Sequence, residues 1–179
     1  MDEPTLIEPD TKDWTVVVSE GCAECGYELP APGEIAPRIL DTIAFWPAAM
    51  AQSGVRERPA PSTWSPLEYA CHVRDVCVVF VERAESMKSQ DGVRFLNWDQ
   101  DEAAVFGRYW EQDPATVAEA YEDAAARVAQ AFASASPAQW KHTGLRSNRS
   151  AFTLATLGSY LLHDLEHHIH DVAAQRPAP

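Results

Sequence analysis

The chain has 179 residues, 46% of them hydrophobic, and a formal net charge of −13 at pH 7. This length suits one domain with a sizeable core, and no apolar run approaches the roughly 18 residues that a membrane span needs. The acidic balance, without a basic stripe, argues against nucleic acid as a partner, because such binding depends on Lys and Arg. The acidic N-terminus lacks the basic-then-apolar order of a secretory signal, so we expect a cytoplasmic protein.

Residues 1–33 are predicted to be an extension of the main domain. Within it, the stretch WTVVV at 14–18 has the aromatic and β-branched composition of a strand. Cys22 and Cys25 follow as a CxxC pair in GCAECGY. This spacing occurs in zinc knuckles and redox pairs, but a single pair also fits a tight turn with two small buried side chains. The extension could serve as a lid, a packing strand, or a second thiol or metal element.

Two helices are predicted in the first half of the main domain. Apolar residues recur at helical spacing over residues 35–46, and Pro47 should kink or end this helix. The second helix begins in the stretch STWSPLEY, where Ser65 fits the N-cap and Glu68 closes a capping box. It should continue to about residue 90. The other two cysteines, at 71 and 77, lie six residues apart on this helix and face different directions.

Two further helices are predicted after a partly helical crossover at 95–113. The third begins at Asp113-Pro114 and carries one apolar stripe. After a polar loop at 136–150, Thr153 can cap a fourth helix that ends near Ala174. No repeat or long linker divides the chain. Four amphipathic helices over residues 34–179 therefore predict an all-α four-helix bundle.

The fourth helix contains four of the six histidines, in the stretch YLLHDLEHHIHDV. On a helical wheel, His168 falls within the leucine stripe, which favours a partly buried imidazole with a local hydrogen bond. His163, His167 and His170 fall on another side. His163 and His167 are four residues apart, so their rings project in the same direction. Such a pair could bind one divalent ion or form a solvent-facing surface, and the residues between the two do not fit a metalloprotease.

A third ligand is needed for a metal centre, and His72 on the second helix is the candidate. It lies at the margin of that helix's buried face, where a lone histidine is usually a core residue. Together with the pair on the fourth helix, it suggests one ion held by His72, His163 and His167. Three imidazoles on two rigid helices would leave coordination positions open, as in catalytic metal sites.

The stretches WSPLEYACHVRDV and LGSYLLHDLEHHIHDV resemble the DinB-like, or DinB/YfiT-like, metal-binding four-helix bundles. The resemblance covers the chain from about residue 34 onward. In this family, one histidine near the start of helix two and an HxxxH pair in the last helix hold a divalent metal, and His72, His163 and His167 match those places. The resemblance implies a DinB-like bundle with zinc as the expected ion and nickel or iron as alternatives.

The family includes mycothiol-dependent maleylpyruvate isomerases and related thiol S-transferases. The resemblance therefore implies a metal-dependent transferase in which a low-molecular-weight thiol is activated against a small electrophile. The isomerase branch is expected to carry a glutamate at the first position of the pair, where this chain has His163, and this departure favours the broader transferase group. A non-catalytic metal- or ligand-binding stress protein is the alternative, and the chain is expected to be a monomer or a homodimer. A third interpretation is that the histidines are only a titratable surface.

Four other residues are candidates for lining the site. Tyr160 lies one turn before His163 and could donate a hydrogen bond, or simply pack at the groove edge. Arg83 could meet an anionic substrate group, although a salt bridge to a carboxylate is the stronger expectation. Asp99 and Asp101 could supply a fourth ligand or hold an imidazole N–H, but a crossover turn rich in Asp and Asn would look the same.

Overall fold

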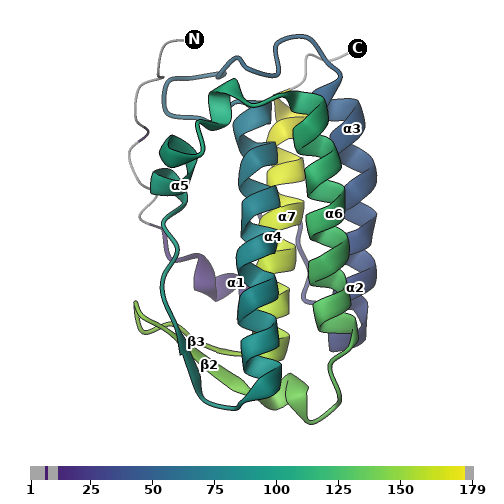
Figure 1. The fold of residues 1–179 in the computed structure, drawn as a ribbon, viewed down its shortest axis with the longest axis vertical. Helices are drawn as coiled ribbons and strands as arrows, with labels where there is room; N and C mark the ends of the chain where they lie inside the picture. Colours follow the sequence, from purple (N-terminus) through teal and green to yellow (C-terminus); the bar gives the residue numbers. More distant parts are fainter. Residues whose placement is uncertain (1–6, 8–11, 176–179) are drawn as a thin grey trace.

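The computed structural model describes residue 7 and residues 12–175. Four long helical segments lie side by side (Figure 1). The elements that build this bundle are α2 (Pro32–Asp41) with α3 (Phe45–Met50), α4 (Pro66–Ser89), α6 (Pro114–Ala133) and α7 (Leu154–Ala174). This arrangement confirms the predicted four-helix bundle. None of the described helices is long and apolar enough to cross a membrane.

The helix boundaries follow local signals in the sequence. Ser65 and Glu68 form the predicted capping box of α4, and the Thr153 side chain accepts a hydrogen bond from the Thr156 backbone at the start of α7. The first helix is interrupted by the 3-10 turn η2 (Thr42–Ala44). Pro47 explains this kink, because it has no N–H to donate and its ring crowds the carbonyl four residues earlier.

The core lies between the helices and contains the predicted apolar stripes. The stripe of α6 is buried throughout, and so are the leucines of α7. The side chains that fill this core include Val117, Tyr121, Ala124, Val128, Phe132, Leu157, Leu161 and Leu165.

A small three-stranded sheet lies at one end of the bundle and was not predicted (Figure 1). β1 (Val93–Phe95) pairs in parallel with β2 (Thr143–Arg146), which pairs antiparallel with β3 (Ala151–Thr153). The crossover between β1 and α6 contains α5 (Gln100–Phe106) and η3 (Tyr109–Glu111), which confirms its partly helical character. β2 lies within the predicted polar loop and β3 directly follows it. Strands of three or four residues are too short to show a clear alternation of apolar and polar residues.

The expected strand at residues 14–18 is wrong. This stretch forms the 3-10 turn η1 (Trp14–Val16) and the short helix α1 (Val17–Glu20). Asp13 initiates the turn by accepting a hydrogen bond from the Thr15 backbone N–H. Val17 packs into the core against the bundle, so tertiary contacts outweigh the weak β-propensity of a short segment.

Candidate metal centre

A pocket of about 580 Å³ opens beside the second half of α7. This volume is in the range of small-molecule sites. His163, Asp164, His167, His168 and Asp171 of α7 form part of its wall, together with residues of the crossover and of the N-terminal extension. The other residues that line it include Trp14, Ser62, Trp64, Tyr69, Asn97, Trp98 and Tyr160.

His72, Asp164 and His168 form a cluster in which one potential ligand atom of each residue lies within 4.8 Å of the others. Asp164 and His168 line the pocket, and His72 is buried next to them. His72 Nε2 lies 3.2 Å from Asp164 Oδ2, and His168 Nε2 lies 3.6 Å from Asp164 Oδ1. Asp164 and His168 are four residues apart on α7, so both side chains project toward the same side of the helix, where α4 presents His72. Two imidazoles and one carboxylate form a typical ligand set for zinc and other divalent metals.

Asp171 fixes the orientation of the His168 ring. Its Oδ2 lies 2.9 Å from His168 Nδ1, which leaves Nε2 directed toward Asp164. Desolvation alone would lower the pKa of His168, but the negative charges of Asp164 and Asp171 outweigh it and raise that pKa. A carboxylate on the far ring nitrogen is the usual partner of a metal-ligating histidine, because it sets the tautomer and makes the ligand more basic.

Burial alone would raise the pKa of Asp164, but the nearby His72 and His168 outweigh this effect and lower the pKa to about 2. The carboxylate therefore stays ionised at neutral pH. His72 is 1% exposed, and its Nδ1 has no hydrogen-bond partner among the described residues. A buried ring nitrogen without a partner is uncommon in folded proteins.

Aromatic rings enclose His72 and His168. The rings of Trp64 and Trp98 lie 5.2 and 5.6 Å from His72, and the Tyr69 ring lies 4.8 Å from His168. These contacts exclude water from two sides of the cluster and restrict how the imidazoles can turn.

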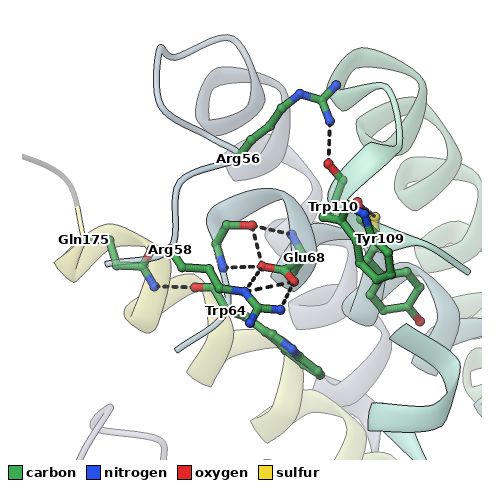
Figure 2. A network of polar contacts seen from close by, with 9 residues as sticks. Arg56, Arg58, Trp64, Glu68, Tyr109, Trp110 and Gln175 are labelled. Carbon is green, nitrogen blue, oxygen red and sulfur yellow. Dashed lines mark hydrogen bonds and ion pairs between the residues drawn. The ribbon is translucent and has the colours of Figure 1, made fainter. Parts of the chain in front are cut away.

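A polar network holds Trp64 in place (Figure 2). Glu68 receives hydrogen bonds from Ser65 and forms an ion pair with Arg58. The Trp64 carbonyl accepts a hydrogen bond from Gln175 Nε2 at the end of α7. The loop before α4 is thereby tied both to its own helix and to α7, which places the Trp64 ring beside His72.

The structure divides the predicted ligands between two clusters. His72 lies with Asp164 and His168, whereas His163 and His167 lie with Cys22 and Cys25 of the extension. His163 and His167 do face the same way, with ring centroids 5.0 Å apart. Both are buried, with the Trp14 ring of the extension against them, and both also line the pocket. That one ion joins His72, His163 and His167 stays a prediction.

The sequence interpretation did not consider Asp164 as a candidate ligand, because on the fourth helix it examined only the histidines. A signal was present: Asp164 and His168 share the four-residue spacing of the histidine pair. The helical wheel also placed His168 on the buried side of the fourth helix. His72 was expected at the margin of the buried face of the second helix, so the two residues could have been predicted to meet. The hydrogen bond of His168 with Asp171 confirms the predicted local partner.

The other candidates lie in different surroundings. Tyr160 lines the pocket with its ring between Phe80 and Phe152. Arg83 donates to the Leu96 carbonyl, and among the described residues it forms no salt bridge, so that expectation is wrong. Asp99 and Asp101 also line the pocket. Asp99 caps α5 by accepting from the Asp101 and Glu102 backbones, and it is not among the described residues grouped with His72.

Comparison with known proteins agrees with this architecture. The family model of the DinB superfamily matches residues 41–172. The solved structure of YfiT from Bacillus subtilis, described as "a probable metal-dependent hydrolase with an unusual four-helix bundle topology", superposes with a TM-score of 0.70. The two chains are 14% identical, and the alignment covers 80% of this chain and 86% of YfiT. Among curated proteins, no sequence matches this one. The match of the family model over most of the chain, together with the shared fold, shows that this protein belongs to the DinB superfamily.

Proposed function

We propose that this protein is a metal-dependent enzyme whose catalytic ion is held by His72, Asp164 and His168. The observation that carries the proposal is the convergence of these three side chains in one cluster, two of whose members, Asp164 and His168, line the pocket. Catalytic metal sites typically use three protein ligands and keep a position open, whereas structural sites are closed by four. This cluster offers three ligands among the described residues, and Asp99, the candidate fourth, is engaged in capping α5. The ligand count favours an enzyme over the alternative of a non-catalytic binding protein.

The proposed reaction is the transfer of a low-molecular-weight thiol to a small electrophile, with zinc as the first candidate metal. A divalent cation held by these residues would lower the pKa of a thiol or water molecule at its open position. The protein would orient the reactants: Asp171 fixes His168, and Trp64, Trp98 and Tyr69 shield the cluster from bulk water. The likeness to YfiT makes hydrolysis, with water as the nucleophile, the competing reaction.

The carboxylate at Asp164 supports the thiol-dependent reaction. The isomerase branch is expected to carry a glutamate at the first position of the helical pair. In the pair Asp164 and His168, that position holds an aspartate, which supplies the same functional group on a side chain shorter by one methylene. The sequence analysis disfavoured the isomerase branch because His163 stands at the first position of the pair His163 and His167. That objection does not apply if the ligand pair is Asp164 and His168.

Tyr160 is proposed as a hydrogen-bond donor to the substrate. It lines the pocket, and burial raises the pKa of its hydroxyl, so the hydroxyl keeps its proton at neutral pH. A protonated phenol can stabilise negative charge that develops on an electrophile.

The test is a zinc-loaded protein incubated with small electrophiles, with and without a low-molecular-weight thiol. Loss of the electrophile only when thiol is present supports transfer, and loss without thiol identifies a hydrolase. His72→Ala and His168→Ala should abolish either reaction, whereas His170→Ala, which replaces an exposed histidine on the same helix, should not. If His163→Ala abolishes zinc binding at the catalytic centre while His168→Ala does not, the set His72, His163 and His167 is the correct one.

A further inference from the structure

A second cluster of metal-ligand side chains lies on the neighbouring side of α7. Cys22 and Cys25, from the turn between α1 and α2, meet His163 and His167, and one ligand atom of each residue lies within 4.8 Å of the others. The pair 163/167 and the pair 164/168 are offset by one residue, so they project from α7 in directions about 100° apart. One helix can therefore supply ligands to two separate centres.

The cysteines lie in a tight turn that two backbone hydrogen bonds close. Gly26 donates to the Cys22 carbonyl at 2.9 Å, and Cys22 donates to the Tyr27 carbonyl at 3.0 Å, which closes the turn. Gly21 and Gly26 have φ values of 73° and 75°, a region that favours glycine. A Cβ at Gly21 would lie 2.6 Å from the Tyr27 carbonyl oxygen, so only glycine fits there. The turn presents both sulfur atoms to α7.

One distance within the cluster matches the value expected for tetrahedral coordination. Cys22 Sγ lies 3.7 Å from His167 Nδ1, close to the roughly 3.6 Å that separates a sulfur and a nitrogen ligand on one tetrahedral zinc ion. His167 Nε2 lies 3.6 Å from Asp171 Oδ1, which is beyond hydrogen-bond distance. His163 is 4% exposed, and its Nε2 has no hydrogen-bond partner among the described residues. The cluster thus contains a buried nitrogen that a cation could satisfy.

Desolvation lowers the pKa of His163 to about 4, so the imidazole is neutral and its lone pair is available. Burial raises the pKa of Cys25 to about 11, so in the absence of a cation this thiol keeps its proton at neutral pH. Zinc binding would release the thiol protons, because the thiolate is the ligand.

We infer that Cys22, Cys25, His163 and His167 bind one zinc ion as a closed, structural site that fastens the N-terminal extension to α7. Four protein ligands of the Cys2His2 type leave no position for substrate. The extension also contributes Trp14 to the pocket wall, so this ion would stabilise one side of the catalytic pocket. The inference does not depend on the proposed reaction.

Cobalt substitution tests this site directly. The full chain, without a histidine tag, is loaded with Co²⁺ and its absorption is recorded. We expect a thiolate-to-cobalt charge-transfer band and the intense d–d bands of tetrahedral cobalt. The double variant Cys22→Ser/Cys25→Ser should lose the charge-transfer band and one equivalent of bound metal. Cys71→Ala, which alters a buried cysteine outside the cluster, should retain both.

Separate variants distinguish this site from the catalytic one. His72→Ala should keep the charge-transfer band whether or not the proposed reaction is correct. A charge-transfer band that persists in the double variant, or cobalt bound to the wild type without such a band, would overturn the inference.

A measurement on the wild type tests the site without using variants that could misfold. Zinc should protect Cys22 and Cys25 from alkylation, as read by mass spectrometry, with Cys71 and Cys77 as buried internal references. Equal alkylation of Cys22 and Cys25 with and without zinc would also overturn the inference.

Discussion

At the scale of single residues, the site depends on charged groups that act through their neighbours. Asp171 touches both clusters: it lies 2.9 Å from His168 Nδ1 and 3.6 Å from His167 Nε2. Glu68 lies further from the pocket, but its ion pair with Arg58 secures the loop that carries Trp64 (Figure 2). Neither residue is a proposed ligand, yet both should matter for the geometry of the metal centre.

Replacing Asp171 with Ala should weaken zinc binding by about 10- to 100-fold, because His168 loses the acceptor that sets its tautomer. Titration against a chelator of known affinity gives the dissociation constant. Asp171→Asn keeps an acceptor oxygen and should restore part of the affinity. Unchanged affinity in Asp171→Ala would show that His168 is held without this carboxylate.

Replacing Glu68 with Gln should lower the free energy of unfolding by about 3 kcal/mol, because the partly buried Arg58 loses its counter-charge. Urea denaturation at pH 7 measures the difference. Glu85→Gln removes the more exposed partner of Lys88 and should change the free energy by about 0.5 kcal/mol or less. Equal effects of the two substitutions would contradict the structural importance of the Glu68 network.

The effect of Glu68 should also depend on pH. Burial alone would raise its pKa, but the hydrogen bonds from Arg58 and Ser65 outweigh burial and hold the pKa below its ordinary value. The stabilisation is therefore complete above the unfolded-state pKa of about 4.3 and is lost as the pH falls through the lower folded-state value. The difference in unfolding free energy between wild type and Glu68→Gln should shrink below about pH 4. A constant difference between pH 7 and pH 3 would refute this.

At the scale of elements, short turns determine where the helices and the extension begin. The turn at residues 21–27 needs a positive φ at its first glycine and has no space for a Cβ there. Gly33 lies in the first turn of α2, where a Cβ would meet no atom of the described residues within 4 Å. The two glycines therefore offer a matched comparison.

Gly21→Ala should destabilise the protein by about 1–3 kcal/mol, because alanine is strained at this φ and its Cβ meets the Tyr27 carbonyl. Gly33→Ala should be neutral or stabilise by up to about 1 kcal/mol, since it reduces the entropy of the unfolded chain. Urea denaturation of both variants in the same buffer measures this contrast. The reverse order of stability would show that the turn at 21–27 is not held as described.

At the scale of the whole molecule, the extension and the bundle meet around α7. Tyr27 donates to the Ser159 carbonyl at 2.8 Å, and Arg38 of α2 forms a two-pronged ion pair with Glu166 of α7. The two candidate metal centres lie on the same helix. Bound metal should therefore stabilise the whole fold, because the ligands are far apart in the unfolded chain.

Removing metal with a chelator should lower the melting temperature of the wild type by about 5–10 °C, as expected from the loss of a ligand present at roughly 100 times its dissociation constant. Differential scanning calorimetry with and without added zinc measures this shift. The shift should be smaller in Cys22→Ser/Cys25→Ser and in His72→Ala than in the wild type. A melting temperature unaffected by zinc would contradict metal binding at either centre.

The sequence by itself determined the four long helical segments of the bundle and the family resemblance. Helix starts such as Ser65 and Thr153 are local, because a capping side chain bonds to a backbone only a few residues away. The apolar stripes of α6 and α7 follow from a period of 3.6 residues, which needs no knowledge of the partner helix. The same information predicted a metal-ligand set on α4 and α7, because the spacing of polar residues on a helix is also local.

Only the tertiary structure decided which of these residues meet. The 100° between neighbouring residues on α7 directs Asp164 and His168 toward α4, and His163 and His167 toward the cysteine turn. That choice depends on the rotation of α7 within the bundle, which packing of the whole core sets. Tertiary contacts also explain why residues 14–18 form helical turns rather than a strand. Contacts of α1 with α7 outweigh the β-propensity of this five-residue stretch.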